Sequence, residues 1–118
     1  GLDVVVSSPY LRCVQTALAI AEHLDLPVLL DLQLGEAFGP DVFGDAVPHK
    51  VPWRSGRKLG EALDAAKAVG VTRIKGGRML GSSPKWPESL ADARCRYARR
   101  SLDYMRRARH THQNCVLV

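Results

Sequence analysis

Two short runs of consecutive apolar residues lie near the start of the chain, and an amphipathic segment separates them. Val4–Val6 is apolar without alternation, which predicts a strand that is buried on both faces. Residues 10–24 follow a helical period, and Val28–Leu30 is again continuously apolar. The predicted apolar face of the helix comprises Leu11, Val14, Leu18 and Ala21. A strand, a helix and a strand in this order predict a βαβ unit and therefore a parallel sheet.

The junction between the first strand and the helix predicts an anion site. Ser8 is a good N-cap residue and Pro9 suits the first helical position, so we expect the helix to begin there. The positive end of the helix dipole would then lie at the carboxyl end of a parallel strand, where open α/β sheets bind ligands. Arg12 adds a guanidinium suited to phosphate. The alternative is a solvent-facing or salt-bridged arginine at an ordinary turn.

Glu36 follows the second predicted strand and is therefore expected at the same sheet edge as Arg12. A carboxylate beside a phosphate pocket acts as a general acid for the leaving group or as a base for an attacking water. The alternative is a loop carboxylate that accepts hydrogen bonds from backbone N–H groups.

Residues 40–87 depart from this regular pattern, because glycine and proline are frequent there. So long a stretch between core elements predicts an insertion or cap within the domain, with a helix at 57–69 and a strand at 71–74. Its lysines and arginines make it basic. A cap that shapes the substrate site and a solvated surface excursion are the two alternatives.

The longest predicted helix covers residues 88–112, with Ser89 as its N-cap and Asp92 at the third helical position. It leads into a final strand at 114–118. The apolar stripe of the helix comprises Leu90, Tyr97, Ser101, Leu102, Met105 and Ala108.

Arginines occupy much of the rest of this helix, and we interpret them as its solvated face. They are Arg94, Arg96, Arg99, Arg100, Arg106, Arg107 and Arg109. A nucleic-acid surface is the alternative, but Asp92 and Asp103 interrupt the charge and no aromatic side chains alternate with it. We therefore do not expect nucleic acid as the partner.

Composition narrows the partners further. The net charge of +5 and the isoelectric point of about 9.5 favour an anionic partner. No apolar stretch approaches the length of a membrane span and no signal peptide is visible, so no membrane is expected. Three cysteines without CxxC spacing predict neither a disulfide framework nor a zinc site, and they favour a reducing, cytoplasmic location.

The histidines do not suggest a metal or cofactor site. His110 and His112 are two residues apart at a helix end, where they do not face one another and where cations suit the dipole. We interpret them as surface caps. His23 and His49 lack the partner spacing of metal ligands.

Three segments resemble conserved blocks of the histidine phosphatase superfamily, the phosphoglycerate mutase-like proteins. Residues 8–17, Ser-Pro-Tyr-Leu-Arg-Cys-Val-Gln-Thr-Ala, resemble its second block, and residues 34–39 are similar to its Leu-x-Glu-x-x-Gly block. Residues 86–89 with the long helix resemble the Glu-Ser helix that precedes the last core strand. Residues 115–118 resemble that strand.

The resemblance implies a three-layer α/β/α fold with a mostly parallel sheet and a phosphohistidine mechanism. In that mechanism a histidine of an Arg-His-Gly tripeptide attacks the phosphoryl group, arginines hold its oxygens and a glutamate handles the leaving-group proton. Arg12 matches the second-block arginine, and Glu36 matches the acid/base carboxylate. No metal or cofactor is implied, because arginines neutralise the phosphoryl charge. The expected partner is phosphate or a small phosphorylated substrate.

The sequence also departs from the family pattern. It contains neither Arg-His-Gly nor the histidine that follows the last strand, and it begins and ends close to predicted strands. We therefore expect residues 1–118 to be a single partial domain, with residues 40–87 as a cap within it. Ala37 and Phe38 replace the mutase-type sequence after Glu36. This favours a phosphatase that acts on a phosphomonoester or, as the alternative, a non-catalytic module that binds phosphorylated ligands or protein partners.

Overall fold

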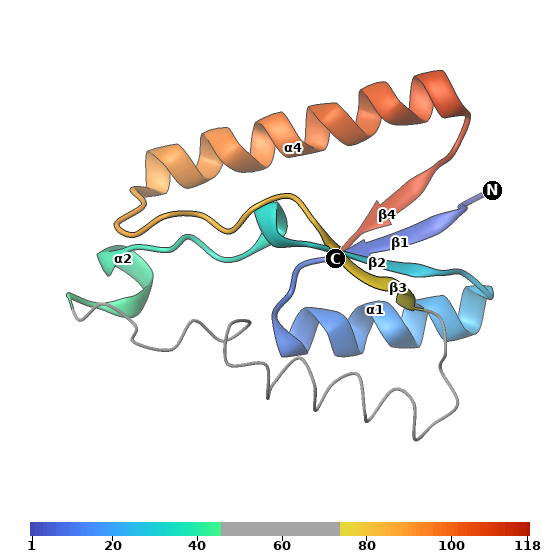
Figure 1. Ribbon diagram of the computed structural model, residues 1–118, viewed down its shortest axis with the longest axis horizontal. Helices are drawn as coiled ribbons and strands as arrows, with labels where there is room; N and C mark the ends of the chain where they lie inside the picture. Colours follow the sequence, from blue (N-terminus) through green and yellow to red (C-terminus); the bar gives the residue numbers. More distant parts are fainter. Residues whose placement is uncertain (46–73) are drawn as a thin grey trace.

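The structure is a computed structural model that describes residues 1–45 and 74–118. Within these ranges, four parallel strands form one sheet in the order β3-β2-β1-β4 (Figure 1). The strands are β1 (Val4–Ser7), β2 (Val28–Asp31), β3 (Ile74–Leu80) and β4 (Cys115–Leu117). The parallel sheet confirms the α/β class that the strand–helix–strand pattern predicts.

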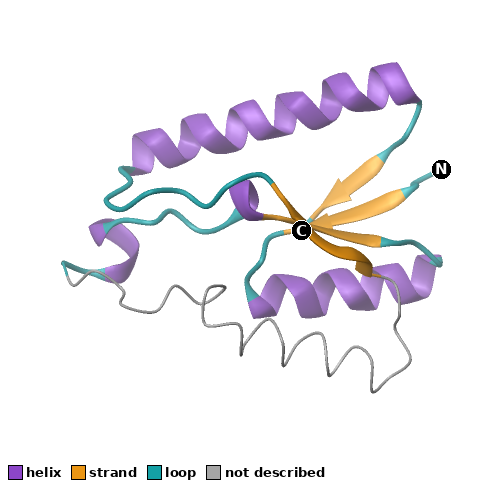
Figure 2. Cartoon of the chain, viewed as in Figure 1, coloured by secondary structure: helices purple, strands orange, loops and turns teal. Residues whose placement is uncertain are grey.

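Two long helices cover the opposite faces of the sheet. Helix α1 (Leu11–Leu24) lies on one side of the strands and α4 (Leu90–Thr111) lies on the other (Figure 2). Two short helical segments, η1 (Leu32–Leu34) and α2 (Pro40–Phe43), follow β2. This is the three-layer α/β/α arrangement that the resemblance to the phosphatase family implies.

The core between α1 and the sheet has the predicted composition. Val5 of β1 pairs with Val28 of β2, and both are fully buried. They pack with α1 residues that recur at helical spacing: Val14, Ala17, Leu18 and Ala21. Burial of such a continuous apolar face accounts for the stability of this layer pair.

The start of α1 differs from the prediction. The N-cap is Tyr10, not Ser8, and Pro9 lies before the helix. The backbone N–H of Ser8 instead donates to the Val118 carbonyl at 2.8 Å, which extends the pairing of β1 with β4 by one residue. Ser8 is thus held by the sheet, and the helix begins after the bend that Pro9 makes.

The inner face of α4 also differs from the predicted apolar stripe. Leu102 and Met105 are exposed to 47% and 63%, whereas Ala93 and Tyr104 are buried. The predicted capping of α4 is confirmed, because the Ser89 side chain accepts a hydrogen bond from the Asp92 N–H. Tyr97, Ser101 and Ala108 of the predicted stripe are half-buried, so the stripe is right in part. Its large aliphatic members are exposed because polar side chains on the inner face bind polar groups of the loop beneath.

The edge strand β3 lies within the range 40–87. It pairs in parallel with β2, with an irregularity in register between Val28 and Leu30. The predicted strand at 71–74 shares Ile74 with it, and residues 71–73 are outside the described residues. The predicted helix at 57–69 also falls outside them. In the two described ranges, no helix combines the length and apolar character that crossing a membrane requires.

Candidate functional site

A cavity of about 340 Å³ opens at the carboxyl ends of β1 and β4. Its walls come from the start of α1, the loop that follows β2, and the inner face of α4. The lining residues are Ser8, Arg12, Cys13, Leu34, Glu36, Tyr97, Ser101, Leu117 and Val118. The carboxyl edge of a parallel sheet is the usual ligand site of open α/β folds, so the fold places the cavity where the sequence predicts a site.

Backbone pairing fixes the floor of this cavity. The Val118 N–H donates to the Val6 carbonyl at 2.9 Å, and Val118 in turn accepts from Ser8. The chain leaves β1 at Ser8 and enters α1 within three residues, so the first turn of α1 faces the cavity. Arg12 lies on that turn. The positive end of the helix dipole and the guanidinium charge therefore act on the same space.

Arg12 and Glu36 meet across the cavity, although 24 positions separate them in sequence. The Arg12 Nη2 donates to the Glu36 Oε2 at 2.9 Å. Their side chains are exposed to 67% and 35%. The Arg12 guanidinium also lies 5.1 Å from the centre of the Tyr10 ring. The structure thus brings both sequence-predicted site residues together, as an open ion pair that borders a cavity.

A second ion pair, which the sequence does not reveal, holds the loop that carries Glu36. Arg96 of α4 donates through Nε to Glu88 at 2.7 Å and through Nη2 to the same carboxylate at 2.8 Å. Its guanidinium also donates to the carbonyls of Gln33, Gly35 and Glu36. The Arg96 and Glu88 side chains are exposed to 13% and 8%. One mostly buried guanidinium therefore satisfies a carboxylate and three carbonyls.

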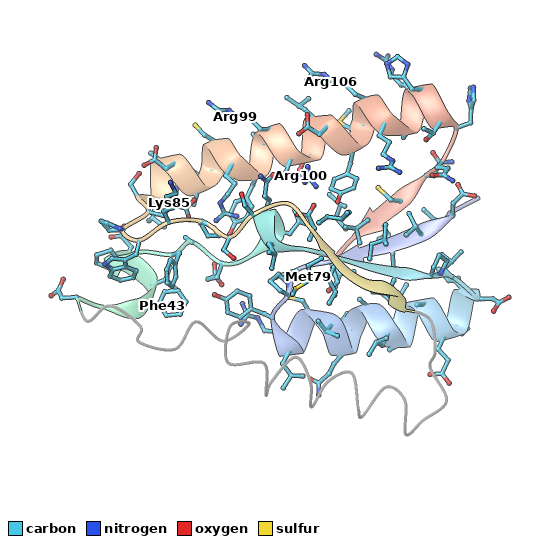
Figure 3. The ribbon with its side chains drawn as sticks, in the orientation of Figure 1. Phe43, Met79, Lys85, Arg99, Arg100 and Arg106 are labelled. Carbon is cyan, nitrogen blue, oxygen red and sulfur yellow. The ribbon has the colours of Figure 1, made fainter. Side chains whose placement is uncertain are left out.

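A third polar contact anchors the end of β2 to α4. The fully buried Asp31 accepts from the Arg100 Nε at 2.6 Å and from the Tyr104 hydroxyl. Its other carboxylate oxygen accepts from the Gln33 N–H at 3.0 Å. Figure 3 shows Arg100 directed inward from α4, whereas Arg99 and Arg106 point away from the sheet. The interpretation of all the helix arginines as a solvated face is therefore wrong for Arg96 and Arg100.

The electrostatics of this network follow from its burial and its pairing. Burial alone would raise the pKa of Glu88, but hydrogen bonds from Arg96 and the Phe38 N–H outweigh it and hold that pKa below its usual value. Burial and the neighbouring Asp31 carboxylate raise the pKa of the Tyr104 hydroxyl. Burial lowers the pKa of Arg96, and its contacts with Glu88 more than reverse this effect. Glu88 and Arg96 are therefore both charged near neutral pH.

The arrangement is suited to binding an oxyanion and exchanging a proton. Arg12 supplies a planar, permanently charged donor, and Glu36 is the carboxylate nearest to it. Within the described ranges, no group of three or more histidine, cysteine or acidic residues is placed to hold a metal ion. His110 and His112 are exposed at the far end of α4 and do not line the cavity.

One signal in the sequence points to the residues that pattern analysis misses. Arg96, Arg100 and Tyr104 recur at four-residue intervals, which places them on one face of a helix. Hydrophobic periodicity does not identify this face as the buried one, because these side chains are polar. The Glu-Ser pair at 88–89 marks the start of the same helix.

Comparison with known protein families identifies a match for the first part of the chain. Residues 1–66, a little more than half of the chain, match a family model described as histidine phosphatase superfamily (branch 1). This range includes Arg12 and Glu36. Searches of curated proteins and of solved structures found no match.

Proposed function

The chain belongs to the histidine phosphatase superfamily, and we propose on that basis that it carries the phosphate-binding wall of a phosphohydrolase. The substrate class is a small phosphomonoester. The reaction proceeds through a phosphohistidine whose histidine lies outside residues 1–118. A cytoplasmic location is proposed with it, because Cys13, Cys95 and Cys115 are all free.

The observation that carries this proposal is the meeting of Arg12 and Glu36 at 2.9 Å on the wall of a cavity. A guanidinium that is two-thirds exposed keeps most of its hydrogen-bonding capacity for a ligand. Exposed ion pairs are worth only about 0–1 kcal/mol, so a phosphate dianion that accepts a bidentate pair of hydrogen bonds displaces the carboxylate at little cost.

The two residues then take different roles. Arg12 and the first turn of α1 hold the phosphoryl oxygens and stabilise the charge that develops on them during transfer. Glu36, released from Arg12, takes up a proton from solvent and donates it as a general acid to the leaving oxygen as the bond from that oxygen to phosphorus breaks. The phosphoryl group passes to the histidine. Water then attacks phosphorus and gives a proton to the Glu36 carboxylate, while the bond from phosphorus to the histidine nitrogen breaks and inorganic phosphate is released.

A second candidate function, binding without turnover, follows from a specific observation. The cavity offers groups that bind phosphate, but no histidine lines it among the described residues. A module with this site binds phosphorylated ligands or protein partners and does not hydrolyse them.

The full-length protein that contains this chain distinguishes the two candidates. We expect it to hydrolyse p-nitrophenyl phosphate, and we expect Arg12→Ala to lower kcat/KM by about 100-fold or more. Arg99→Ala is the matched control, because Arg99 lies on the outer surface of α4 (Figure 3). Phosphate binding that depends on Arg12, without turnover, supports the second candidate. Turnover that is unchanged in Arg12→Ala contradicts the role given to Arg12.

A further inference from the structure

We infer that Arg96 is a positioning residue that sets where Glu36 presents its carboxylate. The inference rests on the proposed function and concerns the same site. Arg96 lines neither the cavity nor the Arg12–Glu36 contact. It acts on Glu36 through the backbone of the loop between β2 and α2.

The contacts of Arg96 converge on the residues around Glu36. Its Nη1 donates to the carbonyls of Gln33 and Gly35, the latter at 3.0 Å, and its Nη2 donates to the Glu36 carbonyl at 3.3 Å. Tyr97, the next residue of α4, donates its hydroxyl to the Gly35 carbonyl at 2.8 Å. Neighbouring residues of one helix thus fix the backbone on the N-terminal side of Glu36.

Glu88 fixes the other side of the loop. The carboxylate that Arg96 holds accepts from the Phe38 N–H at 3.0 Å, and the Glu88 N–H donates to the Phe38 carbonyl at 2.8 Å. A side chain at Gly39 has no room, because its Cβ would lie 2.0 Å from the Glu88 carbonyl oxygen. Glu36 therefore lies between two restrained segments, and Arg96 bonds to both the loop and Glu88.

This restraint matters when phosphate takes Arg12 away from Glu36. Among residues 1–45 and 74–118, the hydrogen bond that remains to the Glu36 carboxylate comes from the Ala37 N–H, which donates to Oε1 at 3.2 Å within the same loop. The carboxylate then points toward the leaving oxygen because the backbone is held. A misplacement of about 1 Å costs on the order of 100-fold in rate, so loosening the loop weakens proton donation.

The ratio of kcat/KM values for two substrates with different leaving groups tests the role of Arg96, because a general loss of structure lowers both values equally. Nitrophenolate leaves without a proton, whereas an alkoxide needs one from Glu36. In the full-length protein we expect Glu36→Gln to lower kcat/KM for ethyl phosphate by about 100-fold or more, and by far less for p-nitrophenyl phosphate. Arg96→Gln is expected to show the same selectivity, with a loss of about 10- to 100-fold on ethyl phosphate.

Three further variants separate positioning from folding. Arg96→Lys keeps a charge opposite Glu88 but cannot reach the carbonyls, so it should show the same selectivity even if Arg96→Gln does not fold. Tyr104→Phe, which loosens the Asp31 contact, and Arg99→Gln on the outer surface should retain the wild-type ratio between the two substrates. In a Glu36→Gln background, Arg96→Lys should cause no further loss that depends on the leaving group.

The outcomes distinguish a failure of the positioning role of Arg96 from a failure of the proposed function. If Arg96→Lys lowers kcat/KM equally for both substrates, or changes neither, Arg96 has no positioning role and the inference is wrong. If Glu36→Gln itself shows no leaving-group selectivity, or the full-length protein has no turnover, the proposed function fails first and the inference falls with it.

Discussion

Two arginine–glutamate ion pairs contact the loop that follows β2, and they differ in their exposure to solvent and in the number of hydrogen bonds they make. Arg12 and Glu36 form one contact at 2.9 Å with both side chains partly open to solvent. Arg96 and Glu88 form two contacts, at 2.7 and 2.8 Å, in a site that is mostly closed. Arg96 also binds three carbonyls, whereas Arg12 has the Tyr10 ring beneath it.

The difference indicates which pair can exchange partners. An exposed ion pair contributes little to stability, so an incoming anion can replace the carboxylate at a small cost in free energy. A buried pair cannot lose a partner without leaving an unpaired charge in a medium of low dielectric constant. The open pair, Arg12–Glu36, is thus suited to ligand binding, and the closed pair, Arg96–Glu88, is suited to holding the loop. Variants of the two pairs test this division.

The largest expected effect is the loss of stability in Arg96→Ala. Removing this side chain leaves the Glu88 carboxylate buried without its cation and removes the donor to three carbonyls. We expect the free energy of unfolding to fall by about 3–5 kcal/mol, measured by urea denaturation. Arg99→Ala on the same helix should stay within about 0.5 kcal/mol. Equal effects in the two variants would show that the closed pair does not hold the fold.

The second effect concerns ligand affinity at the open pair. Arg12→Ala removes the charged donor of the cavity and should weaken the binding of inorganic phosphate by about 10- to 100-fold, measured by isothermal titration calorimetry. Glu36→Gln removes a competitor for the Arg12 guanidinium and should tighten phosphate binding or leave it unchanged. Weaker binding in Glu36→Gln would contradict the exchange of partners at Arg12.

The sequence predicts the open pair and not the closed one, for a physical reason. Arg12 and Glu36 each follow a predicted parallel strand, and the carboxyl ends of such strands share one edge, so their meeting can be foreseen. The partners of Arg96 are mostly backbone carbonyls, which every loop has and which no residue pattern marks. Arg96 and Arg100 are the two of the seven arginines of α4 that turn toward the loop, and this depends on how α4 lies over it.

The fold shows the same division between local and long-range information. The βαβ unit follows from apolar periodicity, because each element buries a face that the sequence displays. The N-cap of α1 does not follow from apolar periodicity, because the Ser8 N–H donates a hydrogen bond to Val118 at the other end of the sequence and keeps Ser8 in the sheet. The exposed Leu102 and Met105 mislead for a similar reason: the inner face of α4 is polar and is satisfied by long-range contacts.

The third effect is a moderate loss of stability at the end of β2. Tyr104→Phe removes one hydroxyl donor from the buried Asp31 carboxylate, which keeps Arg100 and the Gln33 N–H as partners. We expect the free energy of unfolding to fall by about 1.5 kcal/mol, the lower end for a hydrogen bond to a charged group. Chemical denaturation would measure it. A loss as large as that of Arg96→Ala would mean that the Asp31 contact, rather than Arg96, is the main anchor of α4.

The fourth effect is a dependence of stability on pH that belongs to the closed pair. The pKa of Glu88 lies below its usual value of 4.5 in the folded protein, so its contribution is complete above that value and declines as the pH falls through the folded pKa. Urea denaturation between pH 7 and pH 3 should show this decline. Glu88→Gln should be less stable than wild type at pH 7, and the gap should narrow below pH 4.5. A gap that stays constant would show that the Glu88 charge does not stabilise the fold.

The smallest expected effect is on stability at the open pair. Because Arg12 is exposed to 67% and Glu36 to 35%, the double variant Arg12→Ala/Glu36→Ala should lose less than about 1 kcal/mol of unfolding free energy. Added salt should reduce even this difference, since salt screens exposed charges more than buried ones. A loss comparable to that of Arg96→Ala would mean that the pair is a structural clamp and that phosphate cannot displace Glu36 cheaply. An exchangeable ligand site requires that the double variant lose little unfolding free energy and that Arg12→Ala nevertheless bind phosphate more weakly.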